Sequence, residues 1–178
     1  MILDVQSRIG HDPTLNSIKE KTSIAFLMGL NSTVNYAMND ASKDFDGLGI
    51  DYTAINRTIG PGRTVATPTD EINIQLKGVS TASESVLKVT PTHIEYKLGK
   101  SLQAVGNHYL FVVVLPHPEE LLDWCGIDEE KLVLKAVGYY YKVEGTLSAG
   151  VVKIPRSNQL TAEAYMDLFE NVMPVEVV

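Results

Sequence analysis

The sequence predicts an α/β (α+β) protein in which a mixed β-sheet is flanked by helices in a single domain. Helical patterns occupy residues 17–30 and 161–172, near the two ends of the chain, and several strand-like segments lie between them. One segment, residues 110–115, is continuously apolar, which indicates a strand buried on both faces. The order of helix, strands, short helix, buried strand, strands and helix differs from the regular alternation of a Rossmann fold.

The first helix is expected to begin at Ser17. Ser17 and Glu20 have the spacing of a capping box, and the helical pattern continues to about Leu30. Its last part, residues 24–28, is apolar throughout, so we expect it to be buried on most sides. Residues 33–37 alternate weakly between apolar and polar side chains and are expected to form a short strand.

The next two segments are predicted to be strands joined by a long hairpin connection. Residues 50–55 are rich in β-branched and aromatic side chains. Residues 71–79 alternate, so that Ile and Leu side chains fall on one face and Gln75 and Lys77 on the other. Residues 56–69 contain the glycines and prolines typical of a loop.

The second half of the chain is predicted to contain further strands and a last helix. Pattern and composition indicate strands at residues 87–89, 92–98, 108–115, 132–143 and 151–154, and short helical segments at residues 100–105 and 119–124. Thr161 is suited to cap the last helix, in which an apolar stripe is formed by Tyr165, Leu168, Phe169 and Val172.

Composition and charge restrict the class of protein. The 178 residues are enough for one domain, residues 1–178, with a sizeable core. No apolar run is long enough for a transmembrane helix, and the first residues do not resemble a signal peptide. The single cysteine, Cys125, excludes an internal disulfide, so the cytoplasm is the expected compartment. The net charge of −7 argues against a surface that binds nucleic acid everywhere, but not against a local basic groove.

Two short motifs stand on the two strands predicted around the long connection. They are Gly49-Ile50-Asp51 and Gln75-Leu76-Lys77. With the apolar segment 109–116 and the segments 132–141 and 152–161, they resemble the PD-(D/E)XK nuclease superfamily, most closely uncharacterised bacterial and phage domains with a Gly-Ile-Asp and a Gln-x-Lys motif. The resemblance covers about residues 14–172, which we expect to be the core of the domain. At position 75 the chain has an uncharged Gln where the superfamily usually has an acidic residue.

The resemblance implies a restriction-endonuclease-like fold and Mg²⁺-dependent cleavage of DNA, in defence, restriction or phage biology. It implies catalytic roles for Asp51, Gln75, Lys77 and Glu20. It also places an acidic residue near the metal on the first helix, and Glu20 is the candidate because it shares a helical face with the apolar residues. The protein is expected to form either a homodimer, since two sites cut two strands most easily, or a complex with a partner protein.

These residue types also suit phosphodiester chemistry on physical grounds. A phosphodiester repels hydroxide, and a hard cation such as Mg²⁺ or Mn²⁺ offsets this charge and lowers the pKa of bound water. Such cations prefer oxygen ligands, which a carboxylate at Asp51 and an amide at Gln75 provide. Lys77 shares the strand face of Gln75, where its ammonium can orient water or stabilise charge on the phosphate.

Each candidate has a structural alternative. Asp51 is also suited to begin a strand, Gln75 and Lys77 to form the solvated face of an edge strand, and Glu20 to close the capping box. Asp46 is a rival to Asp51 but falls in a predicted loop. On the same fold, a non-catalytic module that binds nucleic acid or protein, and a subunit active only within a larger complex, remain alternative functions.

Other reactive residue types have weaker signals. The four histidines show no metal-ligand spacing, and Cys125, beside Trp124, is expected to be buried packing without a paired base. The Gly60–Arg63 segment lacks the ending of a phosphate-binding P-loop. Scattered cations that are candidates for a phosphate-binding groove are Arg57, Arg63, Lys88, Lys97 and Lys100.

Overall fold

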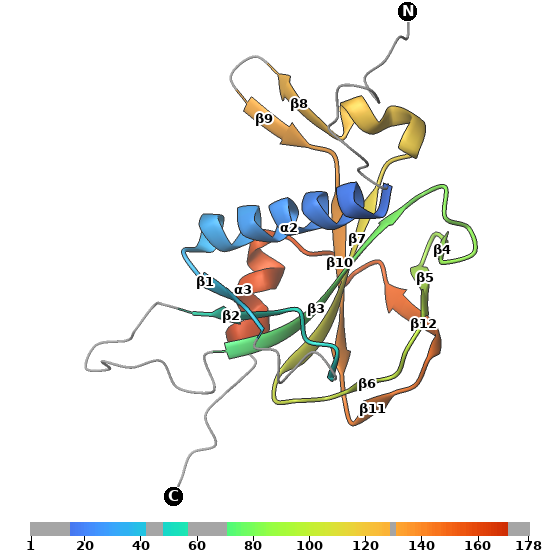
Figure 1. The fold of residues 1–178 in the computed structure, drawn as a ribbon. Helices are drawn as coiled ribbons and strands as arrows, with labels where there is room; N and C mark the ends of the chain where they lie inside the picture. Colours follow the sequence, from blue (N-terminus) through green and yellow to red (C-terminus); the bar gives the residue numbers. More distant parts are fainter. Residues whose placement is uncertain (1–14, 42–47, 57–70, 129–130, 171–178) are drawn as a thin grey trace, which may run out of the picture.

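The computed structural model describes residues 15–41, 48–56, 71–128 and 131–170 (Figure 1). In these ranges the helices are α2 (Leu15–Val34), the 3-10 helix η3 (Pro118–Asp123) and α3 (Ala162–Glu170). The strands are β1 (Ala37–Asp40), β2 (Tyr52–Ile55), β3 (Glu71–Ser80), β4 (Leu87–Val89), β5 (His93–Leu98), β6 (Leu102–Gln103), β7 (His108–Leu115), β8 (Cys125–Asp128), β9 (Lys131–Leu134), β10 (Val137–Val143), β11 (Thr146–Leu147) and β12 (Gly150–Pro155).

A five-stranded mixed sheet forms the centre of the described structure. Its strand order is β1-β2-β3-β7-β10, and only the β3–β7 pair is parallel. Seven of the eight residues of β7 are buried, because β7 lies between β3 and β10 and is covered on both faces. The prediction of a central buried strand at residues 108–115 is therefore confirmed, as is the mixed α/β class.

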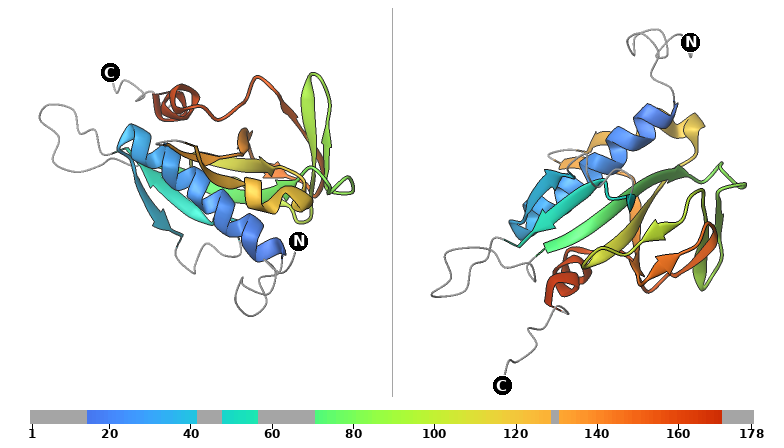
Figure 2. Two further views of the ribbon diagram at one scale, coloured as in Figure 1. Left: turned by 90° about the horizontal axis from the view of Figure 1, so that it is seen from above. Right: turned by 60° about the horizontal axis from the view of Figure 1, so that its bottom comes forward.

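A smaller sheet, ordered β12-β5-β4, stands apart from β1 and β2, on the other side of β3 and β7 (Figures 1 and 2). The short pair β6–β11 and the hairpin β8–β9 complete the described strands. The segment from β4 to β6 thus makes the crossover between the parallel strands β3 and β7, a connection that is usually helical.

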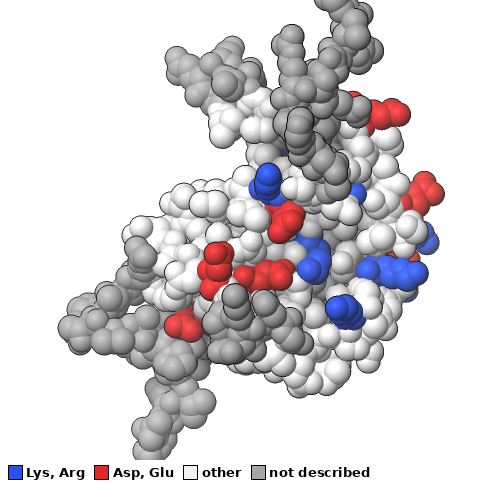
Figure 3. Space-filling view, viewed as in Figure 1, with Lys and Arg blue, Asp and Glu red and all other residues white. Residues whose placement is uncertain are grey.

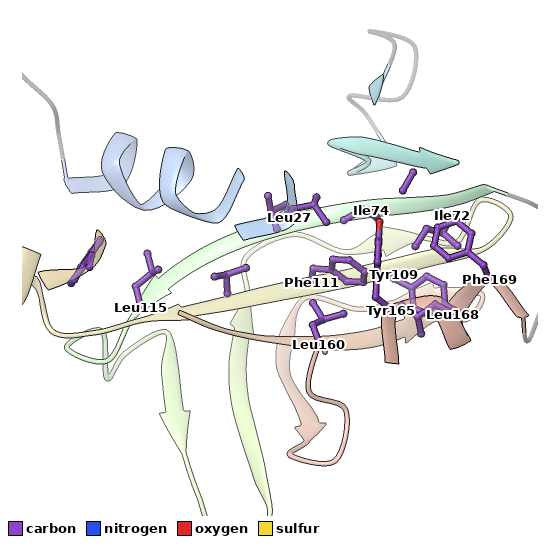
Figure 4. Packing of buried hydrophobic residues seen from close by; sticks show 14 residues of the cluster. Leu27, Ile72, Ile74, Tyr109, Phe111, Leu115, Leu160, Tyr165, Leu168 and Phe169 are labelled. Carbon is purple, nitrogen blue, oxygen red and sulfur yellow. The ribbon is translucent and has the colours of Figure 1, made fainter. Parts of the chain in front are cut away.

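Two hydrophobic clusters lie on the two faces of the central sheet. Paired residues of β3 and β7 point to the same side, so Ile74 and Tyr109 share a face, as do Gln75 and Leu110 on the other. The first face packs against α2 and α3 (Figure 4), and its cluster includes Leu27, Phe111, Tyr165 and Phe169. The second face packs against the small sheet through a cluster that includes Ile94, Tyr96, Leu98, Val152 and Ile154.

The C-terminal end of α2 is closed by backbone hydrogen bonds at Asn35. This residue has a positive φ of 58°. The Asn35 N–H donates to Ser32 O at 3.4 Å and the Tyr36 N–H donates to Asn31 O at 2.9 Å, the pattern of a Schellman motif. The helix therefore extends four residues past Leu30, and the strand expected at residues 33–37 is wrong, because residues 33 and 34 belong to this last turn.

At its other end α2 lies against β3 with almost no intervening side chain. A Cβ atom placed on Gly78 would lie 2.2 Å from Ser23 Oγ and 2.6 Å from the carbonyl oxygen of Lys19. Ser23 is itself buried and turns its hydroxyl back to the Lys19 carbonyl at 2.6 Å. Glycine at position 78 thus lets the first turns of α2 approach the strand that carries Gln75 and Lys77.

Replacing Gly78 by Ala is expected to destabilise the protein by about 1–3 kcal/mol, because the new methyl group meets backbone atoms that cannot move independently. The matched control is Gly29→Ala in the same helix, where a Cβ meets nothing within 4 Å. That variant is expected to be more stable by roughly 0.5–1 kcal/mol. Denaturant unfolding measures both free energies. A Gly78→Ala variant as stable as the wild type would contradict this packing.

Three other expectations differ from the structure. Residues 100–105 form no helix but include β6, which pairs with β11 and takes its conformation from that partner. Residues 132–143 form two strands, β9 and β10, because the chain leaves one pairing at Leu134 and enters another at Val137. The first helix begins at Leu15, so Ser17 lies inside it and not at its N-cap.

Several expectations are confirmed. Residues 71–80 form β3 with the predicted alternation, and β2 pairs with it antiparallel, as the hairpin requires. The hydroxyl of Thr161 accepts a hydrogen bond from the Ala164 N–H at 3.1 Å and so caps α3. In that helix Tyr165, Leu168 and Phe169 are buried. None of the helices in the described ranges is long and apolar enough to span a membrane.

Candidate active site at the edge of strand β3

Asp51 lies at the point where β2 stops pairing with β3. Its N–H donates to Ile74 O at 2.8 Å, which is the last backbone bond between the two segments. Two residues further along β3, the Leu76 N–H donates to the Asp51 carboxylate, with Oδ2 at 2.8 Å. The side chain thus takes the place of the missing neighbouring strand, and this fixes the carboxylate at the edge of β3.

Gly49 makes this turn into β2 possible. It has a φ of +75°, a conformation that favours glycine. A Cβ at this position would lie 2.5 Å from Gln75 Oε1 and 2.6 Å from Leu102 Cδ2. The glycine of the Gly-Ile-Asp motif therefore permits both the backbone turn and the approach of Gln75 to Asp51.

Gln75 and Lys77 converge on Asp51 from the second face of the sheet. The Gln75 side chain is 4% exposed, and its Nε2 donates to Asp51 Oδ2 at 2.6 Å. Lys77 Nζ lies 3.6 Å from the same oxygen, and both of these side chains are more than one third exposed. The structure thus brings together three of the four residues that the sequence predicts, although 24 or more residues separate Asp51 from the other two.

The amide of Gln75 donates to Asp51 and does not offer its oxygen in this arrangement. An ionised carboxylate only accepts hydrogen bonds, so the Gln75 amide is oriented with its NH₂ group, and not its oxygen, towards Asp51. A hydrogen bond from a buried amide to a charged acceptor is worth roughly 1.5–3 kcal/mol. The partly exposed ion pair between Lys77 and Asp51 contributes about 1 kcal/mol or less. Gln75 therefore holds Asp51 in place more firmly than Lys77 does.

A pocket of about 540 Å³, the helix-side pocket, lies between the first turns of α2 and the edge of the sheet. Carboxylates of Glu20, Asp40 and Asp51 line it, together with the ammonium groups of Lys19 and Lys77. Glu20 is thus the fourth predicted residue, and it lies in the same pocket as Asp51. Among the described residues, however, no three carboxylate, His or Cys side chains are close enough to hold one metal ion together.

The effect of these carboxylates is visible at Tyr52. Burial raises the pKa of its phenol, and the nearby charges of Asp40, Asp51 and Glu20 raise this pKa further. The phenol therefore stays protonated beside an acidic pocket. On the face shown in Figure 3, most acidic side chains of the central region lie towards β1 and β2, and most basic ones lie towards β5.

A second pocket, the sheet-side pocket, opens on the other side of Asp51 and Lys77, towards the turn between β5 and β6. Asp51 and Lys77 line both pockets. The other polar residues of the sheet-side pocket are Gln75, Tyr96, Lys100 and Ser101. Burial raises the pKa of the Tyr96 phenol, and the charge of Asp51 raises it further, so that this group also stays protonated.

Sequence reasoning missed Asp40, Tyr52 and Tyr96 as members of the site. Asp40 ends β1 and is paired with Tyr52, and this pairing brings it beside Asp51. The signal that would have found it is the pairing of β1 with β2. Tyr96 reaches the site because the small sheet packs over β3, which no local pattern indicates.

The remaining candidates lie elsewhere. His108 is fully buried, with Nδ1 3.1 Å from Gln103 O, and burial lowers the pKa of its imidazole. His93 lies beside Glu95 and His117 beside Glu119, away from both pockets.

Cys125 was expected to be buried but is exposed, since Trp124 takes the buried position before β8. His11, Asp46, Arg57 and the Gly60–Arg63 segment lie outside the described residues.

Comparison of the chain with protein-family models, with curated proteins and with solved structures finds no match.

Proposed function

We propose that the protein is a metal-dependent nuclease that hydrolyses DNA phosphodiester bonds. The observation that carries this proposal is the convergence of Asp51, Gln75 and Lys77 at one point on the edge of β3, with Glu20 in the pocket beside it. These are the residues on which the resemblance to the PD-(D/E)XK superfamily rests. A carboxylate and an ammonium group side by side in an open pocket suit a phosphodiester with its cation.

The order of elements around the site supports a restriction-endonuclease-like core. After helix α2 and strand β1 come the antiparallel pair β2–β3 and later β7, which pairs parallel with β3. The Gly-Ile-Asp motif lies directly before β2, and the Gln-x-Lys motif lies in β3. Between β3 and β7 the described chain forms β4, β5 and β6 where the resemblance implies a helix. The proposed relationship therefore rests on the helix and the three strands around the site.

The residues of the helix-side pocket fit a hard cation that keeps most of its water ligands. Mg²⁺ is commonly held by one or two carboxylates and retains several waters. Asp51 would be the direct ligand, and Glu20 and Asp40 would accept hydrogen bonds from the waters. A cation held there would neutralise the phosphate and lower the pKa of a bound water. Gln75 would become a ligand only if its amide turned so that Oε1 faced the cation.

Lys77 is placed to act on the substrate. Its ammonium group lies beside Asp51 and borders both pockets, so an anion in either pocket can reach it. We propose that it binds a non-bridging oxygen of the scissile phosphate and stabilises the charge that develops there. A fixed charge in a partly enclosed pocket does this without reorganisation during the reaction.

The test is cleavage of DNA by the purified protein. Single-stranded and duplex DNA should be cut when Mg²⁺ or Mn²⁺ is present, and excess EDTA should stop the reaction. Heat-denatured protein controls for the reagents, and a preparation of the Lys77→Ala variant controls for contaminating nucleases. Cleavage that continues in EDTA, or equal cleavage by wild type and Lys77→Ala, would contradict the proposal.

One observation favours a second function, a binding module without catalysis. Gln75 is neutral and occupies Asp51 Oδ2 as a hydrogen-bond donor, and no three acidic, His or Cys side chains in the described chain come together around a metal. Such a module would bind nucleic acid in EDTA but would release no heat with Mg²⁺ or Mn²⁺ in calorimetry. A subunit of a larger complex would instead cut DNA only when its partner is added.

A further inference from the structure

The two pockets that meet at Asp51 and Lys77 differ in charge. The helix-side pocket is lined by three carboxylates and two ammonium groups. The sheet-side pocket has Asp51 as its single carboxylate, shared with the first, while Lys77 and Lys100 supply two positive charges. The chain as a whole carries a net charge of −7, whereas this pocket has more ammonium than carboxylate groups and is therefore locally positive.

The neutral groups of the sheet-side pocket are hydrogen-bond donors. The phenol of Tyr96 stays protonated. The hydroxyl of Ser101 accepts a hydrogen bond from the Ala149 N–H at 3.0 Å, which leaves its own proton to be donated. Hydroxyl and ammonium groups around an open pocket suit a phosphate group, which only accepts hydrogen bonds when it is a diester.

Lys100 is the most available of these groups. It is exposed in the turn between β5 and β6, and it makes no ion pair with a described residue. Lys77, by contrast, is paired with Asp51. Lys100 can therefore bind an anion without first giving up another partner.

We infer that the sheet-side pocket binds a phosphate of the nucleic-acid strand next to the phosphate that is cleaved, and that Lys100 contacts it. This inference rests on the proposed function and extends it to the path of the substrate. Because Asp51 and Lys77 border both pockets, a strand that places its scissile phosphate at Lys77 leads directly into the sheet-side pocket. The helix-side pocket then holds the cation, and the sheet-side pocket fixes the strand.

The experiment is equilibrium binding of a fluorescein-labelled single-stranded DNA to wild type, Lys100→Gln and the control Lys142→Gln, in EDTA and over a series of salt concentrations. Lys142 is also an exposed lysine, on β10, two strands from β3. Lys100→Gln should weaken binding about three- to tenfold and lower the slope of log K against log salt by about 0.7, the value for one lost phosphate contact on a single strand. Lys142→Gln should bind as wild type does.

Equal affinity and slope for wild type and Lys100→Gln would overturn the inference, as would wild-type protein that binds no DNA. Titration with inorganic phosphate separates the two sources of a phosphate group. If Lys100→Gln weakens binding of inorganic phosphate but not of DNA, the pocket takes a free anion and the inference is also overturned. Since all binding is measured without metal, these results do not depend on cleavage, which tests the proposed function separately.

Discussion

Replacing Asp51 by Asn is expected to reduce Mg²⁺-dependent cleavage of DNA at least about 100-fold, the usual order for loss of a group that stabilises transition-state charge. The amide oxygen of Asn can still accept the hydrogen bonds that Leu76 and Gln75 donate to Asp51. The substitution therefore removes the negative charge and the metal ligand while keeping the local structure. Initial rates of cleavage at saturating Mg²⁺ measure the effect.

Asn is a sharper substitution than Ala at this position. Asp51→Ala would leave the Leu76 N–H and the buried Gln75 amide without an acceptor, at a cost of roughly 1–3 kcal/mol each in stability. The matched control is Glu144→Gln, which removes one negative charge from an exposed side chain at the end of β10. It should cleave at the wild-type rate. An Asp51→Asn variant that folds normally and cleaves as fast as this control would exclude Asp51 as the metal ligand.

Replacing Gln75 by Glu is expected to make the stability of the protein depend on divalent cations. The substitution would place a second carboxylate at hydrogen-bond distance from Asp51, in a position that is 4% exposed. Burial and the Asp51 charge would raise the pKa of the new carboxyl group in the folded state. Without metal, the free energy of unfolding should fall by about 1–4 kcal/mol near neutral pH, since each pKa unit corresponds to about 1.4 kcal/mol.

The dependence on pH and on metal identifies this effect. Below about pH 4.3 the new carboxyl group is protonated in both the folded and the unfolded state, so it causes no pH-dependent loss of stability. Because its pKa is raised in the folded state, the free energy of unfolding falls as the pH rises from this value through the folded-state pKa. Mn²⁺ bound between the two carboxylates should reverse the loss, so the Tm of Gln75→Glu should rise with Mn²⁺ more than the wild-type Tm. The control is Gln103→Glu, the same change at an exposed position of β6. Identical Mn²⁺ shifts in the three proteins would contradict the proposed metal position.

The central strands could be predicted because their patterns are unambiguous. The alternation of β3 and the continuous apolar sequence of β7 reflect how many faces of each strand are buried, and this is a local consequence of the global fold. The Gln-x-Lys motif could be assigned to a strand for the same reason, whereas the Gly-Ile-Asp motif lies directly before β2, which begins at Tyr52 and not at residue 50. Their convergence then follows from the pairing of β2 with β3.

The errors occur where a distant partner determines the local structure. Leu102 and Gln103 form a strand only because β11 lies beside them, and the break between β9 and β10 reflects two different partners. Residues 33 and 34 have β-branched side chains, but Asn35 adopts the left-handed conformation that ends α2 after them. Propensity within a short segment contains none of this information.

The same limit applies to the site. Asp40 and Tyr96 reach it through the pairing of β1 with β2 and through the packing of the small sheet over β3. The close approach of α2 depends on Gly78, and the sequence around Gly78 does not indicate that a helix packs against it. The role of Gln75 is also a matter of geometry, since the sequence does not show which half of its amide faces Asp51.

The most direct test of the central claim, that Asp51 holds a divalent cation at the edge of β3, is a calorimetric titration of the wild-type protein and the Asp51→Asn variant with Mn²⁺. The proposed site predicts saturable binding of one Mn²⁺ per chain by the wild type and loss of this binding in Asp51→Asn, while Glu144→Gln binds as the wild type does. Absence of Mn²⁺ binding by the wild type, or undiminished binding by Asp51→Asn, would contradict it.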